Sequence, residues 1–158
     1  FRYLEQLGRL AKKGVKVVMH NTLNASEYAL LDQETHDPRP NYWAALLWNR
    51  LMGTQVYAAD TLAKGVDVFV HNQKGSSSGR SVLILNTNDA DFYFESPAEA
   101  EQYLLTADEL LTKRVQLNGE ELALQPNHTL PILNGKKVKA GEVMLPAHSI
   151  LFLRFFQI

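Results

Sequence analysis

The sequence has no cysteine among its 158 residues, so no disulfide can form within the chain and thiol usage gives no indication of its compartment. Neither positive nor negative charge is in clear excess, because the formal net charge is only -1. This balance provides no general attraction to nucleic acid or to an anionic membrane. No apolar run matches a signal peptide or a membrane span. We therefore expect no nucleic-acid partner and no membrane span.

The composition is that of a globular domain, with 46% hydrophobic and 21% charged residues. The chain is long enough to bury one core but shorter than a (β/α)8 barrel, which needs about 250 residues. It begins at Phe1, and its first methionine, Met19, lies inside an apolar pattern. We therefore expect a processed, nicked or truncated product.

The N-terminal third has the pattern of a β/α repeat. Apolar residues at helical spacing predict a helix over residues 1–13 that ends at Gly14. Residues 15–19 (VKVVM) are short, β-branched and almost wholly apolar, which is typical of a buried parallel strand. After a polar loop, Asn41 is the expected N-cap of a second helix, which runs to Met52.

The remainder of the chain alternates apolar and polar residues, as half-buried strands do. Asn118 and Gly119 separate two alternating runs and predict a tight type I′ hairpin. Residues 74–79 (KGSSSG) predict a flexible loop between strands. The spacing of the runs favours an antiparallel sandwich. The predicted strands cover residues 66–71, 81–86, 91–94, 103–105, 115–117, 121–124, 142–145 and 150–156.

Four segments of this chain, in this order and rough spacing, resemble the heparanase-like family of glycoside hydrolases: residues 28–54, 112–124, 127–133 and 145–155. The resemblance implies an α+β fragment. Residues 1–55 would form the C-terminal end of a (β/α)8 TIM barrel, and residues 56–158 an antiparallel β-sandwich domain.

The same resemblance implies the C-terminal portion of a retaining endo-β-glucuronidase that hydrolyses glucuronide linkages in heparan sulfate-type polysaccharides. Both catalytic glutamates of the family would precede Phe1, so we expect no catalytic residue and no activity in this chain alone. A companion polypeptide would carry the rest of the barrel. We expect no cofactor and no metal, and a secreted or periplasmic location. At the position of one cysteine of animal heparanases the chain has Asn72, which favours a bacterial source.

The candidate substrate-binding residues follow the predicted barrel strand, because barrel active sites lie at the C-terminal ends of the strands. They are His20, Asn21, Ser26, Glu27 and Tyr28. Tyr28 matches the family tyrosine that lines the glucuronate subsite. The family has a Gly-Asn-Tyr type sequence there, whose backbone N–H groups face the sugar carboxylate, whereas this chain has Ser26-Glu27-Tyr28.

Plainer interpretations compete with these assignments. Tyr28 fits a barrel rim with a wet hydroxyl, and His20 fits a packing role. The carboxylates of the loop fit turn residues and caps better than a catalytic pair. Trp43 or Trp48 fits the core, and the lysine clusters fit solvated surfaces. The loop carboxylates belong to Glu27, Asp32, Glu34 and Asp37, and the lysine clusters are Lys12, Lys13 and Lys16, then Lys136, Lys137 and Lys139.

Two alternatives to the leading function stay open. One keeps the family but changes the substrate to hyaluronan or short glucuronides. The other is a stand-alone carbohydrate-binding or structural β-sandwich module, which accounts for residues 57–158 but leaves the β/α pattern of residues 1–52 unexplained. The sequence does not decide between exo and endo action or between sulfation patterns.

Overall fold

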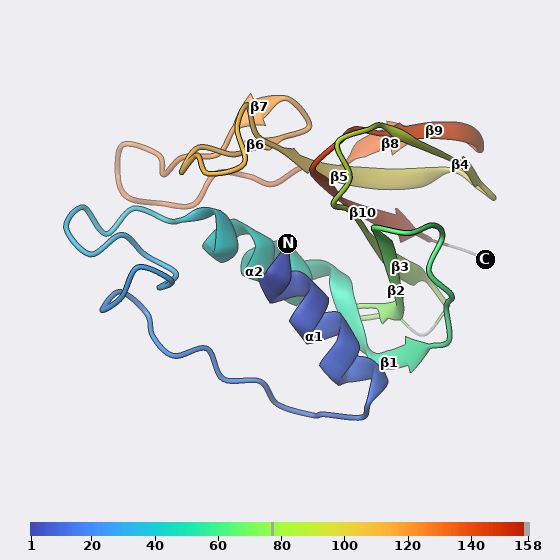
Figure 1. The fold of residues 1–158 in the computed structure, drawn as a ribbon, viewed down its shortest axis with the longest axis horizontal. Coiled ribbons are helices and arrows are strands. Elements are labelled where there is room, and N and C mark those ends of the chain that lie inside the picture. Colours follow the sequence, from blue (N-terminus) through green and yellow to red (C-terminus); the bar gives the residue numbers. More distant parts are fainter. Residues whose placement is uncertain (77, 157–158) are drawn as a thin grey trace.

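The computed structural model describes residues 1–76 and 78–156, and Ser77 of the predicted loop over residues 74–79 lies outside the described residues. Two helices precede an antiparallel β-region (Figure 1). The helices are α1 (Arg2–Lys12) and α2 (Pro40–Leu51). The strands are β1 (Met52–Tyr57), β2 (Val66–Gln73), β3 (Arg80–Asn86), β4 (Phe92–Ser96), β5 (Ala100–Thr106), β6 (Gln116–Leu117), β7 (Glu120–Glu121), β8 (Lys136–Val138), β9 (Gly141–Leu145) and β10 (Ser149–Phe155).

Both predicted helices are present. Gly14 follows α1 with a φ of 80°, the left-handed conformation that glycine adopts at a helix end. The prediction of Asn41 as the N-cap of α2 is wrong, because Arg39 is the N-cap and Pro40 occupies the first helical position. Proline is favoured there, since its fixed φ suits the helix and no N–H is needed. The Asn41 side chain instead donates to the carbonyl oxygens of Tyr28 and Ala29.

Residues 15–19, predicted as a barrel strand, form no strand within the described part of this chain. Within the described residues this segment pairs with no strand, and Val17 and Met19 are 69% and 89% exposed. Figure 1 shows it leaving the end of α1 and running apart from the sheets. A strand forms only where a neighbouring strand pairs with its backbone, and no described strand lies beside this segment.

The strands form an eight-stranded sheet and a two-stranded sheet. The larger one follows the order β1-β2-β3-β10-β5-β6-β7, with β8 also paired to β5, and the smaller one joins β4 to β9. All of these pairs are antiparallel. The predicted hairpin is confirmed, since β6 pairs with β7 around Asn118 (φ 53°) and Gly119 (φ 90°).

Two strands, β1 and β8, were not predicted from the sequence. We expected the second helix to run to Met52, but Met52 and Gly53 both belong to β1. We expected Lys136 and Lys137 to lie on a solvated surface, and although they are exposed they form the edge strand β8 against β5. Lysine is common on edge strands, where it discourages pairing with other chains.

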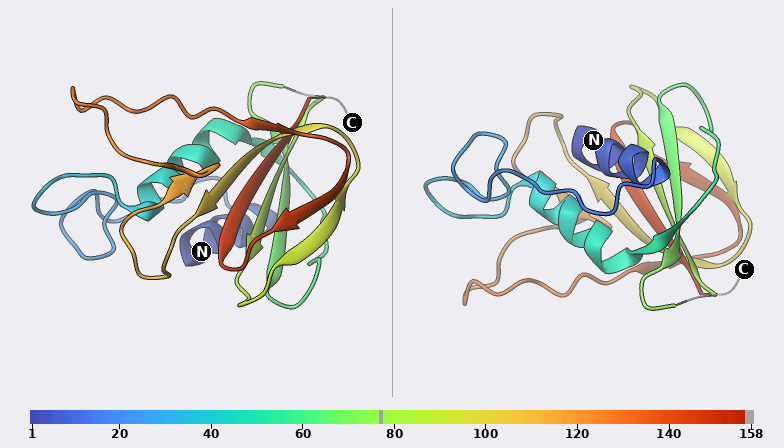
Figure 2. Two further views of the ribbon diagram at one scale, coloured as in Figure 1. Left: turned by 90° about the horizontal axis from the view of Figure 1, so that it is seen from above. Right: turned by 90° about the horizontal axis from the view of Figure 1, so that it is seen from below.

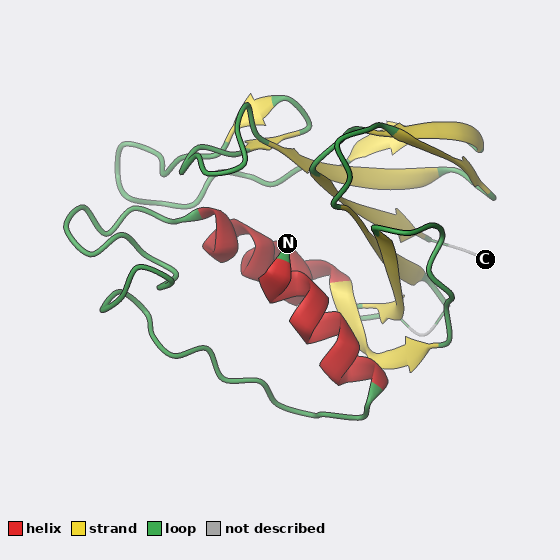
Figure 3. Ribbon diagram, viewed as in Figure 1, coloured by secondary structure: helices red, strands yellow, loops and turns green. Residues whose placement is uncertain are grey.

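The large sheet has both faces covered, as Figures 2 and 3 show. Both helices lie on one face, where Leu4 and Leu47 join Phe69 and Phe152 in one core. The β4–β9 sheet lies on the opposite face, where Leu145 joins the second core. The fold is therefore a mostly-sheet α+β arrangement. The domain boundary at residue 55 stays a prediction, and residues from both sides of it share the first core.

Candidate substrate-binding site

The loop between α1 and α2 brings His20 back against Tyr28. The His20 Nε2 atom donates to the Tyr28 carbonyl oxygen over 3.1 Å. The two rings meet edge to face with 6.5 Å between centroids, and Tyr3 of α1 contacts the His20 ring in the same way at 5.1 Å. His20 thus has a packing and hydrogen-bonding role that ties the loop to α1.

The backbone of residues 26–29 is held by the residues around the start of α2. The Arg39 guanidinium donates to the carbonyl oxygens of Ser26, over 3.3 Å, and of Glu27. The Asn41 amide donates to the carbonyl oxygen of Tyr28 over 3.0 Å. With three successive carbonyl groups bound, the direction of the chain at Tyr28 is defined.

The five predicted site residues are brought together only in part. Tyr28 is 63% exposed, so its ring is free to contact a ligand. The side chains of Glu27 and Asn21 are also exposed, while the Ser26 hydroxyl is buried without a hydrogen-bond partner among the described residues. His20 therefore lies beside the segment 26–28 through its hydrogen bond to the Tyr28 carbonyl oxygen. Of the five side chains, that of Tyr28 is the best placed to contact a ligand.

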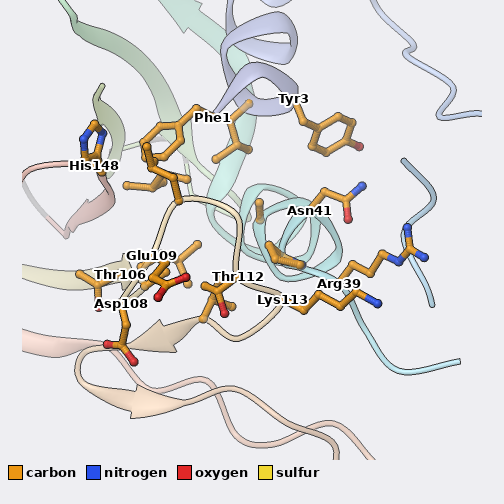
Figure 4. Close-up of a pocket in the computed structure, with 18 of the residues that line it drawn as sticks. Phe1, Tyr3, Arg39, Asn41, Thr106, Asp108, Glu109, Thr112, Lys113 and His148 are labelled. Atoms are coloured by element: carbon orange, nitrogen blue, oxygen red, sulfur yellow. The ribbon is translucent and has the colours of Figure 1, made fainter. Parts of the chain in front are cut away.

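A cavity of about 550 Å³ lies beside this segment, between the starts of both helices and the loop that joins β5 to β6 (Figure 4). Sequence reasoning missed most of its polar lining. The missed residues include Arg39, Asn41, Asp108, Glu109, Thr112, Lys113 and His148. Their positions along the chain carry no common pattern, since the cavity forms only when distant loops meet.

Asp32 is the charged centre of the loop. Its Oδ2 atom accepts from Lys113 at 2.9 Å and from Arg39 at 3.4 Å, and its Oδ1 accepts from the backbone N–H groups of Glu34 and Thr35. The hydrogen bond from Lys113 is the largest of the causes that hold the pKa of this carboxyl well below its usual range. Asp32 is therefore ionised at neutral pH and caps a turn, as the sequence favoured.

A second hollow of about 1170 Å³ separates the exposed segment 15–18 from α2 and the start of β1. The His71 ring lies in its wall, where Nδ1 donates to the Gly53 carbonyl oxygen over 2.8 Å and the ring meets Trp48 edge to face. Burial lowers the pKa of His71, which favours the neutral form of the ring. Its Nε2 atom is buried without a partner among the described residues. Trp43 is buried in the protein interior, as predicted for one of the two tryptophans.

Residues 1–76 and 78–156 contain no group of three His, Asp or Glu side chains placed to hold a metal ion. No described helix is long and apolar enough to cross a membrane. The expectations about metals, cofactors and membranes stay predictions.

Sequence comparison places the chain among sugar-cleaving enzymes. No family model matches it. It is 33% identical, over 97% of its length, to a baicalin-β-D-glucuronidase from Scutellaria baicalensis, and 33% identical over 96% to a heparanase from Mus musculus. This chain belongs with the heparanase-like glycoside hydrolases by sequence. The heparanase-like chain is also 29% identical to a hyaluronoglucuronidase from Hirudo nipponia, over 92% of its length.

The heparanase-like chain spans only about a third of each relative, 31% of the plant enzyme and 32% of the mouse enzyme. Solved structures show that the fold itself is found in glycoside hydrolases. A family 51 arabinofuranosidase from Xanthomonas axonopodis pv. citri matches 95% of the chain and 34% of its own, with a TM-score of 0.58 and 17% identity. A family 30 subfamily 8 xylanase from Clostridium acetobutylicum matches 94% of the chain and 38% of its own, with a TM-score of 0.54 and 11% identity. A bacterial source for this chain stays a prediction.

Proposed function

We propose that this chain is the C-terminal portion of a retaining endo-β-glucuronidase that cleaves glucuronide linkages in heparan sulfate-type polysaccharides. The observation that carries the proposal is the alignment of 97% of the chain with a β-glucuronidase at 33% identity. Relatives named for baicalin and for hyaluronan differ in the rest of the substrate. Their names share the glucuronide, so cleavage beside a glucuronate is the common chemistry.

In this proposal the chain binds sugar and a companion polypeptide performs the bond cleavage. Retaining glycosidases use two carboxyl groups about 5 Å apart, one as nucleophile and one as acid and base. We assign both to the companion. The exposed Tyr28 ring would line the glucuronate subsite, and the backbone N–H groups of residues 26–28 would donate to the sugar carboxylate.

The exposed segment 15–19 supports the existence of the companion. Its alternate residues Val17 and Met19 are exposed, although such a run is typical of a strand buried inside a parallel sheet. We assign it as the last strand of a TIM barrel whose other strands belong to the companion, and the second hollow as the space those strands enter. Processing in a secretory or periplasmic route would supply the two polypeptides.

The test compares two exposed tyrosines in the purified enzyme. Tyr28 is 63% exposed and Tyr93, on β4, is 56% exposed, so Tyr28→Ala and Tyr93→Ala remove matched side chains. Native mass spectrometry first asks whether the chain travels with a larger polypeptide. Cleavage of heparan sulfate, hyaluronan and a short aryl glucuronide is then measured for each variant.

We expect a complex whose glucuronide cleavage falls about tenfold or more in kcat/KM with Tyr28→Ala and stays unchanged with Tyr93→Ala. A folded monomer that binds sugar without cleaving it would contradict the proposal and favour the stand-alone carbohydrate-binding module. Faster cleavage of hyaluronan than of heparan sulfate would keep the enzyme class and change its substrate.

A further inference from the structure

Arg39 holds two successive backbone carbonyl groups with one guanidinium. It donates to the carbonyl oxygens of Ser26 and Glu27, 13 and 12 positions earlier in the chain. Its side chain is only 16% exposed. Both hydrogen bonds come from Nη1, while Nη2 lies 3.4 Å from the Asp32 carboxylate. The planar guanidinium therefore serves the two carbonyl groups and the carboxylate from separate nitrogens, which the single ammonium of lysine cannot do.

The charge of Arg39 is balanced by Asp32, which is also shared with the β-region. The Asp32 Oδ2 atom lies 3.4 Å from an Arg39 nitrogen and 2.9 Å from the Lys113 ammonium. Lys113 belongs to the loop between β5 and β6, 81 positions away along the chain. One carboxylate therefore joins the loop that carries Tyr28 to a loop of the large sheet.

The backbone of residues 26–31 has other attachments, including the Arg39 N–H to the Leu30 carbonyl oxygen and the Asn41 amide to the Ala29 carbonyl oxygen. Ala29 and Leu31 donate within the loop, to the carbonyl oxygens of Ser26 and Leu23. His20 and Asn41 bind the Tyr28 carbonyl oxygen. The side-chain contacts of Arg39 lie immediately before Tyr28, whose ring is exposed.

We propose that Arg39 is a positioning residue for substrate binding: it holds the Ser26 and Glu27 carbonyl groups so that Tyr28 faces the sugar, and the Asp32–Lys113 contact anchors it to the sheet. The inference rests on the proposed function in one respect, since Tyr28 must be a substrate contact. Arg39 and Lys113 both line the cavity beside this loop, as Figure 4 shows.

The first test measures the loop itself. Hydrogen–deuterium exchange is followed in the protein as purified, with any polypeptide that travels with it. Lys113→Met removes the anchor, and Arg114→Met is the matched control, because Arg114 is the next residue and its side chain is 82% exposed. We expect amide exchange over residues 26–31 to rise about tenfold with Lys113→Met and to stay unchanged with Arg114→Met.

The second test separates positioning from general stability. Arg39→Lys keeps the charge but has no second nitrogen to bind Asp32 while the first binds the two carbonyl groups. We expect KM to rise about tenfold with kcat within about twofold, because ground-state sugar binding is what weakens. Arg39 acts through Tyr28. The double variant Arg39→Lys/Tyr28→Ala should therefore be no worse than Tyr28→Ala alone.

The outcomes distinguish the inference from the function on which it rests. Amide exchange over residues 26–31 is measured for Arg39→Lys as well. If it is unchanged in both Lys113→Met and Arg39→Lys, the positioning role is overturned, whatever the activity. Additive losses of kcat/KM in the double variant overturn the action through Tyr28. If the wild-type protein cleaves no glucuronide, the proposed function and the link to substrate fail together, while the exchange result still decides whether Arg39 holds the loop.

Discussion

Gly8 of α1 faces the ring of Phe69 on β2, and a Cβ atom added at Gly8 would lie far inside van der Waals contact with that ring. The helix approaches the sheet closely here, and Phe69 is 2% exposed, so its ring has little room to move. We predict that Gly8→Ala lowers the free energy of unfolding by about 1–2 kcal/mol, because overpacking outweighs the gain in helix propensity of about 1 kcal/mol. Urea unfolding measures the change.

The matched control for Gly8 is the double variant Gly8→Ala/Phe69→Leu. Leucine removes the ring atoms that meet the new methyl group, so the two substitutions should cost less together than the sum of their separate costs. Strict additivity, or a more stable Gly8→Ala protein, would contradict the close approach of α1 to β2.

Much of the sheet was predictable because its central strands are covered on both faces. β3 and β10 contain continuous apolar runs (VLIL and ILFL), and helices and the β4–β9 sheet bury them from opposite sides. The segment 15–19 reads the same way but finds no neighbour in this chain. Local pattern gives the tendency to be a strand, while the partner strands decide whether one forms.

The candidate site was less predictable for a related reason. Tyr28 and its neighbours were identified through the family resemblance, but Arg39 lies between two prolines with no periodic signal of a role. The contact between Lys113 and Asp32 spans 81 positions. Periodicity describes neighbours along one helix or strand, so it carries no information about two loops that meet only after folding.

Asn118 combines a left-handed backbone with a side chain that holds the neighbouring strands. Its Oδ1 atom accepts from the Leu104 N–H over 3.0 Å, and its Nδ2 donates to the carbonyl oxygens of Gln102 and Asn134. We predict that Asn118→Gly costs about 1–3 kcal/mol, because these hydrogen bonds are lost while the turn conformation is kept.

Asn118→Ala should cost about 1 kcal/mol more than Asn118→Gly, because alanine also disfavours a φ of 53°. Thermal unfolding of both variants separates the two contributions. Equal stability of the alanine and glycine variants would show that the left-handed conformation is not required at position 118.

Asp32 should make the protein sensitive to acid. Its pKa in the folded state is lowered, chiefly by the hydrogen bond from Lys113, so the folded protein binds this proton less readily than the unfolded chain does. The stabilisation is present above the ordinary pKa of about 4 and is lost as the pH falls below it. We predict that the melting temperature drops less steeply below about pH 4 in Asp32→Asn than in the wild type.

Lys113→Met should reduce the drop of the melting temperature in acid only in part, because the N–H groups of Glu34 and Thr35 still stabilise the Asp32 carboxylate. Arg114→Met should leave the drop of the melting temperature in acid unchanged. Parallel curves for the wild type and Asp32→Asn from about pH 6 to pH 2 would contradict a lowered pKa at Asp32.

Val17 and Met19 provide the sharpest test of the companion polypeptide. They are two residues apart, so in an extended strand their side chains lie on one face, and both are exposed in this chain. If a companion buries them, each should contribute about 1.5–3 kcal/mol of apolar burial to the complex. We predict that Val17→Thr/Met19→Thr weakens the complex about a hundredfold, while Leu111→Thr, which changes an apolar side chain that is 97% exposed on another loop, leaves it intact.

Sedimentation or native mass spectrometry measures the binding, and the unfolding of the separated chain should be the same for all three proteins. A double variant that binds as tightly as the wild type would show that residues 15–19 are not a strand of a shared barrel, and it would require another explanation for an apolar run left exposed beside α2.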